Sequence, residues 1–284
     1  MWVGSASVVD MDPIVGTEAI ANGSLTRGQL RWRYTALYPD VYVPTDARIS
    51  LSTRATGAWL WTGRTGIIAG TTAAGLWGVE PPDASAPIEL IAKQRRTPRG
   101  VELRQQRISD DEVRRMGELP VTSPARTALD LGRFLPREDA LIRLDRLAAT
   151  TGVARQQVAR LVDRYRGTRG IERAREVAGL MDAGAWSPRE SLLRLRLIDA
   201  GLPHPETSVS VGDQYARAVV ALGWPGPKVG IDFVDLCPDR TARRQQVWHR
   251  NVIKTNGWIT IEVDDDYELP QTLYLVRKAL RLRR

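Results

Sequence analysis

The 284-residue sequence has few of the residues that form disulfides and metal sites. Its one cysteine is Cys237, so an internal disulfide is excluded and a reducing compartment, the cytoplasm, is expected. The two histidines and the single cysteine give no spacing that suits zinc. Glycine-rich phosphate loops and the Gly-x-Ser-x-Gly motif of serine hydrolases are also missing. We therefore expect no cofactor, no bound metal and no small-molecule substrate, with one alternative given below.

Long apolar runs are missing as well. No run approaches the roughly 20 residues that a transmembrane helix needs. Residues 1–12 have no basic region and carry Asp10 and Asp12, which is not the pattern of a signal peptide. Together these observations predict a cytoplasmic protein without a membrane partner.

Lysine is scarce relative to arginine. Only Lys93, Lys228, Lys254 and Lys278 occur among 41 basic residues, and the formal net charge is +8. Arginine binds phosphate through paired hydrogen bonds, whereas lysine acts as a point charge. The excess of arginine therefore favours an acidic polymer, DNA, as the partner. Codon preference in a GC-rich genome is an alternative explanation for arginine over lysine, but it does not explain the net positive charge.

The most informative stretch that is present runs from Ala221 to Asp235. Two short apolar runs flank the turn 224–227, Trp-Pro-Gly-Pro, a pattern typical of a β-hairpin. A helix opening at Ser187 precedes the hairpin, and the apolar run 257–263 predicts a further strand after it. The order helix, hairpin, helix, strand, helix predicts a small α/β nuclease core.

Several segments of residues 184–284 match a known family. They are Ser187-Pro188-Arg189-Glu190-Ser191, Asp199-Ala200-Gly201-Leu202-Pro203-His204-Pro205, Leu222-Gly223-Trp224, Ile231-Asp232-Phe233 and Gly257-Trp258. On these segments the region resembles the Vsr-like branch of the PD-(D/E)xK nucleases, which implies a restriction-endonuclease-like domain. The family has an Asp three residues before the hairpin tryptophan, an acidic motif on the next strand, and a His beyond it. The site positions at which this sequence departs from the family are Ala221, Val234, Asp235, Pro238, Gln246 and His249.

Two acids remain where that family has its catalytic centre. Phosphodiester hydrolysis needs a divalent cation such as Mg²⁺, which takes oxygen ligands that include one or two carboxylates. If the domain is active, the resemblance implies that Asp232 and Glu190 hold that cation. Glu190 has a second interpretation, because Ser187 followed by Glu three residues later is a helix-capping box. His249 has no set of metal ligands around it in the sequence, so a surface or core role is its alternative.

Residues 12–50 have the pattern of a small, reduced winged helix. Short helices are predicted over 13–21 and 25–31, followed by a hairpin built from 32–35 and 41–43. The segments Leu25-Thr26-Arg27-Gly28-Gln29-Leu30 and Val41-Tyr42-Val43-Pro44 resemble the N-terminal domain of AbiEi-type antitoxins, which implies DNA binding. The family has a recognition helix between these segments, which we expect to be missing or very short here. The alternative is a structural cap on the next domain. The residues predicted to contact phosphate are Arg27, Arg31 and Arg33.

Residues 51–183 predict an α/β unit followed by a helical bridge. Helices are expected over 51–62 and 71–77, paired strands at 88–91 and 101–104, and a helix that starts at Ser123-Pro124. The segments Gly75-Leu76-Trp77-Gly78 and Leu119-Pro120-Val121-Thr122-Ser123-Pro124-Ala125-Arg126-Thr127-Ala128-Leu129-Asp130 resemble the second domain of the same antitoxin family. The resemblance covers residues 14–150, and Met11 is an alternative to Met1 as the start because the family-like sequence begins there.

Two further basic clusters are candidates for nucleic-acid contact. One lies in the hairpin loop expected between the paired strands 88–91 and 101–104, and a solvated loop is its alternative. The other follows the hairpin at 224–227. Their residues are Lys93, Arg95, Arg96, Arg99, Arg240, Arg243 and Arg244.

The sequence therefore predicts an α/β (α+β) protein in three parts: a winged-helix-like head at 12–50, an antitoxin-like unit at 51–183, and a degenerate nuclease-like domain at 184–284. The first functional hypothesis is a DNA-associated, non-catalytic protein of the AbiEi antitoxin type. The second is a Mg²⁺-dependent DNA endonuclease that uses Asp232 and Glu190. The third is an antitoxin that binds a cognate toxin protein and contacts no nucleic acid.

Overall fold

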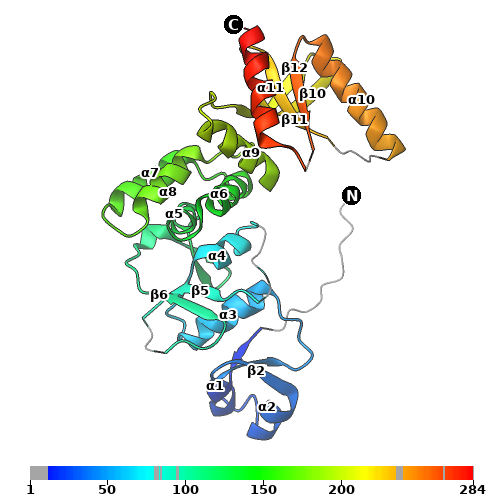
Figure 1. Ribbon diagram of the computed structural model, residues 1–284. Helices are drawn as coiled ribbons and strands as arrows, with labels where there is room; N and C mark the ends of the chain where they lie inside the picture. Colours follow the sequence, from blue (N-terminus) through cyan, green and yellow to red (C-terminus); the bar gives the residue numbers. More distant parts are fainter. Residues whose placement is uncertain are drawn as a thin grey trace. The chain divides into compact units, whose positions relative to one another are not determined.

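The computed structural model describes residues 12–79, 83, 85–93, 96–234, 239–264 and 266–283 (Figure 1). Over these residues the chain has a mixed α/β fold with three β-sheets, as the sequence predicts. It divides into two compact units, of which the first comprises residues up to 135 together with 150–179. The second comprises 136–149 and 180–284. In the described part, no helix combines the length and the apolar character needed to cross a membrane.

The first unit begins with a small antiparallel sheet. Its strand order is β1-β3-β2, and the two short helices lie between β1 and β2 in the chain. The helix predicted over 13–21 starts three residues later, because residues 14 and 15 pair with β3. The second helix leads directly into the hairpin, so no further helix separates them. The elements are β1 (Ile14–Val15), α1 (Gly16–Ala21), α2 (Arg27–Arg33), β2 (Tyr34–Tyr38) and β3 (Val41–Pro44).

This small sheet shares a hydrophobic core with the helix that follows it, α3 (Leu51–Trp61). Tyr38 and Val41 are buried in the same cluster as residues of α3. Gly57 permits the close approach, since a Cβ there would lie 2.7 Å from a methyl group of Leu37. Residues 12–50 are thus packed on the next segment of their own unit, and the predicted three-part division stays a prediction.

The second sheet of the first unit has five strands in the order β6-β5-β4-β8-β7. Its central strands bury Ile68, Leu90 and Val121 completely, and alanines of α3 and α4 pack against them. The strands at 88–91 and 101–104 pair as predicted, but they are parallel rather than a hairpin. The elements are β4 (Ile67–Ile68), α4 (Gly70–Leu76), β5 (Ile88–Ile91), β6 (Val101–Arg104), β7 (Val113–Met116) and β8 (Leu119–Thr122).

Helices complete the first unit and join it to the second. The helix α5 (Pro124–Phe134) begins at the predicted Ser123 cap, whose hydroxyl accepts from the Arg126 N–H. A core of Leu129, Leu161 and Ile171 then joins it to the helices further along the chain. Those helices are α7 (Arg155–Arg164) and α8 (Ile171–Leu180). Between α5 and α7 in the chain lies α6 (Arg137–Thr151), of which residues 137–149 belong to the second unit.

The second unit is built on a four-stranded sheet in the order β12-β11-β10-β9. The predicted hairpin is confirmed, with Trp224 paired to Val229 across the turn. β11 and β12 are parallel, and Figure 1 shows the strands lying between α10 and α11. β9 pairs with β10 and was not foreseen from the sequence. The elements are α9 (Pro188–Asp199), β9 (Glu206–Gly212), β10 (Arg217–Trp224), β11 (Val229–Phe233), α10 (Arg240–Thr255), β12 (Ile259–Val263) and α11 (Leu269–Leu282).

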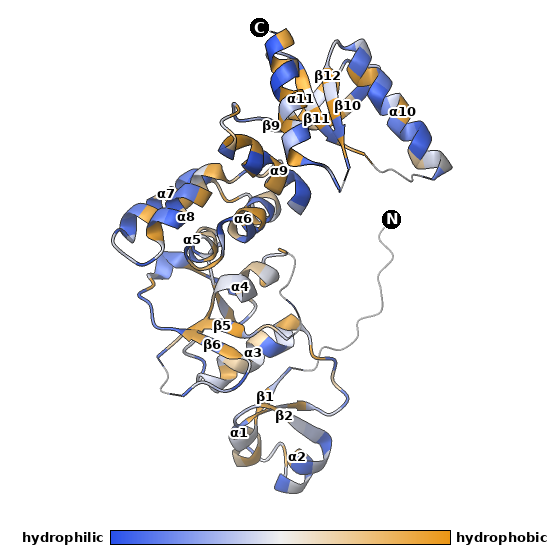
Figure 2. Cartoon of the chain, viewed as in Figure 1, coloured by the Kyte–Doolittle hydropathy of each residue, from blue (hydrophilic) through white to orange (hydrophobic). Residues whose placement is uncertain are grey.

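Two apolar clusters hold this sheet to its helices. One joins Leu193 of α9 and Val276 of α11 to β10, β11 and β12, and both side chains are fully buried. The other joins Ile253 of α10 to β9 and β10. Residues of α10 are otherwise mainly hydrophilic, coloured blue in Figure 2. α10 therefore contacts the sheet through a few apolar residues, and most of its surface is polar.

Candidate functional site

The nuclease-like site predicted from the sequence lies on two neighbouring strands. Ala221 is on β10 and Asp232 is on β11, one position beyond the paired residues Leu222 and Ile231. The backbone groups of Ala221 and Phe233 act on the Asp232 carboxylate and lower its pKa. Where the nuclease family would place two facing carboxylates, this chain has one carboxylate and a backbone donor.

Asp232 forms a pair with a histidine from α10. Nδ1 of His249 lies 3.2 Å from Oδ2 of Asp232, and its Nε2 lies 3.0 Å from the carbonyl oxygen of Val219. Because both partners accept, the ring can donate to both only when both of its nitrogens carry protons. Burial raises the pKa of Asp232 to about 6, even though the nearby His249 acts to lower it, and Glu262 adds a smaller upward effect.

The pair opens onto a pocket of about 510 Å³. Glu262 lines the same pocket, in register with Asp232 on the adjacent strand. Its carboxylate is held by Arg250, at 2.5 and 2.6 Å. Among the described residues, no group of three histidine, cysteine or acidic side chains could hold a metal ion. The pocket therefore combines charged groups with apolar side chains, and its described lining lacks the oxygen cage that Mg²⁺ takes.

The remaining residues of the predicted catalytic site have local roles. Glu190 lies in the first turn of α9 and accepts from the Trp186 N–H at 3.0 Å, one residue before the Ser187 cap. The Val234 N–H donates to the carbonyl of Val263, and Gln246 lines the pocket beside His249. Asp235 and Pro238 fall outside the described residues.

The arginines of the first predicted DNA contact lie together on α2. No residue of this helix is buried, and it contains no acid. Thr26 and Gln29 cap its start reciprocally, at 2.8 and 3.2 Å. Trp32 is 80% exposed, with Arg31 stacked on it at 5.8 Å. Within the described chain, Arg27, Arg31 and Arg33 have no carboxylate partner.

The other predicted contacts are also on the surface. Lys93, Arg96 and Arg99 are exposed in the segment that connects β5 to β6, and Arg95 lies outside the described residues. Because β5 and β6 are parallel, this segment is a crossover and not the predicted hairpin loop. Of the predicted contacts on α10, Arg243 and Arg244 are exposed, while the side chain of Arg240 is outside the description.

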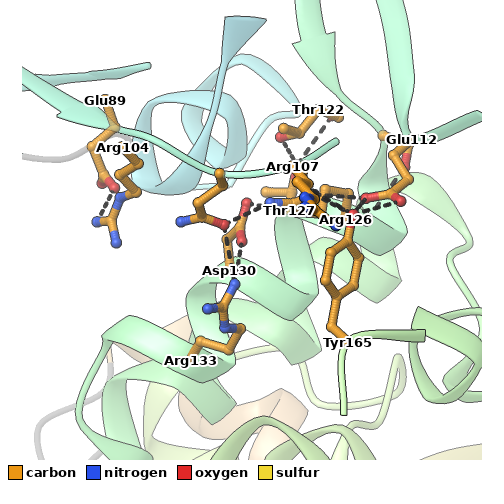
Figure 3. Close-up of polar contacts among 12 residues, drawn as sticks. Glu89, Arg104, Arg107, Glu112, Thr122, Arg126, Thr127, Asp130, Arg133 and Tyr165 are labelled. Carbon is orange, nitrogen blue, oxygen red and sulfur yellow. Dashed lines mark hydrogen bonds and ion pairs between the residues drawn. The ribbon is translucent and has the colours of Figure 1, made fainter. Parts of the chain in front are cut away.

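The first unit also contains a buried ion network that the sequence did not reveal (Figure 3). Arg126 of α5 is completely buried and donates to Glu112 at 2.6 Å and to Asp130 at 3.1 Å. Tyr165 joins it, donating to Glu112 and stacking on the Arg126 guanidinium at 5.0 Å. Burial raises the pKa of Tyr165 to about 12, and its hydrogen bond to Glu112 adds to the rise. The spacing of Arg126 and Asp130, four residues apart on α5, is a signal for the ion pair between them, although it does not indicate that the pair is buried.

The network ties three parts of the first unit together. It links the segment before β7, the inward face of α5 and the end of α7. Arg133 extends it along α5, donating to Gln106 at 3.0 Å and to the carbonyl of Arg169 at 3.1 Å. Burial raises the pKa of Asp130 despite the adjacent Arg126 guanidinium. Arg126, Glu112 and Tyr165 bind one another within the protein. Oδ1 of Asp130 has no hydrogen-bond partner among the described residues and lies 3.7 Å from Nη1 of Arg133. The network is therefore a structural element of this unit.

Comparison with known proteins gives a family match over this region. Residues 65–180 match the AbiEi antitoxin C-terminal domain. Two proteins of Mycobacterium tuberculosis, Uncharacterized protein MT2308 of strain CDC 1551 / Oshkosh and Uncharacterized protein Rv2248 of strain ATCC 25618 / H37Rv, are each 32% identical over 203 residues. That alignment covers 68% of this chain and 73% of each relative. The crystal structure of the RV2827C protein from Mycobacterium tuberculosis aligns with a TM-score of 0.41 at 16% identity, over 71% of this chain and 84% of that one.

The domain match covers the second sheet and the buried network described above. It supports the predicted antitoxin-like part, and with it a role of the toxin–antitoxin type. The chain belongs to the same family as the two mycobacterial proteins, and its residues 65–180 match the AbiEi antitoxin C-terminal domain.

Proposed function

We propose that this chain is an antitoxin of the AbiEi type that associates with duplex DNA through its N-terminal residues and does not cleave it. The observation that carries the DNA association is α2, a capped helix with three exposed arginines, no acid and no buried residue. Short isolated helices are marginal in water, and helices in proteins are normally held by an apolar face. An exposed, basic helix of this kind is suited to a polyanionic partner.

The arrangement around α2 supports the proposal. A helix, a turn and a second helix are followed directly by a β-hairpin, and the first strand pairs with the last to give the order β1-β3-β2. A helix-turn-helix unit places its second helix in the major groove, where its N-terminal residues face the bases. α2 is in that second position. In this proposal Arg27 and Arg31 contact phosphates, and the β2–β3 hairpin lies beside the backbone as a wing.

The toxin-binding half of the proposal rests on the domain match at 65–180. An antitoxin acts through a cognate toxin, so we propose a toxin protein as the second partner. An antitoxin that binds only protein is the competing version, and it is favoured by the stacking of Arg31 on exposed Trp32, a combination also common at protein interfaces. Co-purification with the product of the neighbouring gene tests the toxin partner.

Duplex DNA titrated at several salt concentrations tests the DNA association. Each phosphate contact contributes about 0.9 to the slope of log K against log salt for B-DNA. The double variant Arg27→Ala/Arg31→Ala should therefore lower the slope by about 1.8 and weaken binding at every salt concentration. Arg160→Ala, an exposed arginine on α7, is the matched control and should bind as wild type. If the double variant bound duplex DNA like the control, α2 would not be the contact.

A cleavage assay with Mg²⁺ or Mn²⁺ tests the non-catalytic part. The proposal expects intact DNA, because Ala221 replaces one carboxylate and Glu262 is engaged by Arg250. Metal-dependent cutting that disappears in Asp232→Ala would replace this proposal by the endonuclease alternative, in which Asp232 and Glu190 serve Mg²⁺.

A further inference from the structure

The C-terminal half of α11 carries a dense basic surface. Within 269–283 there is no acid, and all of its basic residues are exposed. We name this surface the α11 basic face, consisting of Arg277, Lys278, Arg281 and Arg283. The opposite side of the same helix packs against the core, where Val276 and Ala279 are buried. The basic side is therefore the side that remains accessible to a partner.

Hollows lie on both sides of this arginine row. One, of about 570 Å³, is lined by Leu202 and Pro203, which follow α9, and by Trp224 and residues of the hairpin turn. The other, of about 410 Å³, is lined by the exposed ring of Tyr274 and by apolar and basic residues of α11. Both hollows are bordered by Arg277 and Arg281, and neither has an acid in its lining. The surface thus combines partly apolar recesses with guanidinium groups.

The charges on this face are not neutralised within the described residues. Arg277 donates to the carbonyl of Ala200 at 2.9 Å, and Arg283 donates to the carbonyl of Gly257. These hydrogen bonds position both side chains, and because a carbonyl group is uncharged they do not neutralise the positive charges. For Lys278 and Arg281, no carboxylate partner occurs in the part of the chain described. Arg277 and Arg281 are four residues apart, a spacing at which like charges repel. The helix dipole favours cations only in the last turn, so it does not account for Arg277.

We propose that the α11 basic face and its two hollows bind single-stranded nucleic acid. Guanidinium groups take the phosphates in paired hydrogen bonds, and unstacked bases enter the recesses. Tyr274 is 62% exposed beside Arg277 and Lys278, which offers a ring face for one base. A duplex keeps its bases stacked inside and could use only the arginines. The combination of recesses, one accessible ring and a row of cations therefore fits an unpaired strand.

This site is separate from the Asp232 pocket and from α2. The basic face adjoins the β10–β11 turn, where β11 starts at Val229, whereas Asp232 lies near the other end of that strand. The proposal does not depend on DNA association by the N-terminal residues, and either can fail alone.

The test uses the full chain and a fluorescent twelve-nucleotide oligothymidine, followed by fluorescence anisotropy at several salt concentrations. Lys278→Ala/Arg281→Ala should lower the salt slope by about 1.4, at about 0.7 for each phosphate contact of a single strand. Tyr274→Ala should weaken binding by about tenfold or more without changing the slope, since stacking is not ionic. Circular dichroism verifies folding, which these exposed positions should not affect.

Two controls decide between this surface and others. Arg217→Ala removes an exposed arginine at the opposite end of β10 and should leave binding unchanged. Arg27→Ala/Arg31→Ala should retain binding of the single strand. If the Lys278/Arg281 double variant bound like wild type, or if only the α2 variant lost the oligonucleotide, the proposal would be wrong. Displacement of the oligonucleotide by polyglutamate at equal charge concentration would instead assign the face to an acidic protein.

Discussion

At the scale of single residues, the buried guanidinium of Arg126 is expected to have a large effect on the free energy of unfolding. Its side chain has no exposed area, and it faces Glu112, which is 1% exposed, and Asp130. Removing one member of a buried ion network leaves an uncompensated charge and costs about 3–5 kcal/mol. Arg126→Met should therefore lower the free energy of unfolding by that amount, as measured by urea denaturation. Arg160→Ala should leave the urea midpoint unchanged, and an equally mild effect of both changes would contradict the burial of the network.

A pH-dependent effect is expected at Asp232. Its pKa is raised from 3.8 to about 6 in the folded state, so between these values the unfolded chain loses a proton that the folded chain keeps. Folding is therefore penalised progressively as pH rises from 4 to 6, and the penalty is complete above the folded pKa. Asp232→Asn removes this penalty and should stabilise the protein by up to about 3 kcal/mol at pH 7, at 1.36 kcal/mol per unit.

The pH profile of urea unfolding for wild type and Asp232→Asn verifies this. The difference between the two should vanish below about pH 4, where the carboxyl is protonated in both states. A difference that is constant from pH 4 to pH 7 would show that the effect comes from packing and not from ionisation.

One further residue-scale expectation concerns the altered nuclease position. Ala221→Asp alone should not produce Mg²⁺-dependent cleavage of DNA, because Asp232 stays paired with His249 and the neighbouring Glu262 with Arg250. A plasmid-nicking assay of this variant, with wild type as the reference, measures the outcome. Metal-dependent nicking by the variant would mean that one added carboxylate is enough to complete the site.

Sequence reasoning reached some of these residues and missed others for a physical reason. The pairing of β10 with β11 places Ala221 beside Asp232, and this follows from the turn residues and the apolar alternation. The burial of Arg126 does not follow, since arginine is exposed in most settings and a local pattern cannot show which one a fold encloses. Its partners Glu112 and Tyr165 come from distant segments, which only tertiary structure brings together.

At the scale of elements, α5 and α8 approach each other unusually closely at one glycine. A Cβ on Gly132 would lie 2.9 Å from the Cα of Ala174, a backbone atom that cannot move alone. Gly132→Ala should therefore push the helices apart and cost about 1–3 kcal/mol in urea unfolding. Gly179→Ala on α8 is the matched control, because nothing lies within 4 Å of its added methyl group. That change should stabilise the protein by about 0.4–1 kcal/mol, and a loss in both variants would argue against close packing as the cause.

The elements themselves were predictable where local chemistry decides them. The caps at Thr26, Ser123 and Ser187 and the hairpin turn after Trp224 all rely on residues adjacent in the chain. The strand β9 and the parallel pairing of β5 with β6 depend on long-range partners. A short apolar run carries no information about the direction of its neighbour, so a hairpin was expected at 88–104 where the chain makes a crossover.

At the scale of the whole molecule, each of the two compact units is built from two segments that are separated in the sequence. Residues 136–149 belong with 180–284, and Asp145 in this segment binds the buried Arg194 at 2.7 Å and Ser191 at 2.7 Å. A fragment that begins at residue 184 lacks this carboxylate, so Arg194 would keep a buried charge without its partner. We expect fragment 184–284 to unfold at lower urea concentration than the same unit in the full chain, as followed by tryptophan fluorescence. Equal midpoints would show that 184–284 is a self-sufficient domain.

Because residues 150–179 return to the first unit, they also determine when that unit can finish folding during synthesis. Leu129 packs against Leu161 and Ile171, which are translated after the segment 136–149 that goes to the other unit. The N-terminal unit therefore cannot complete its core on the ribosome until residue 179 has left the exit tunnel, whereas domains made from one continuous segment can close as soon as they emerge. Until then the nascent chain exposes the apolar side of α5. We expect chaperones to bind this apolar surface during that interval.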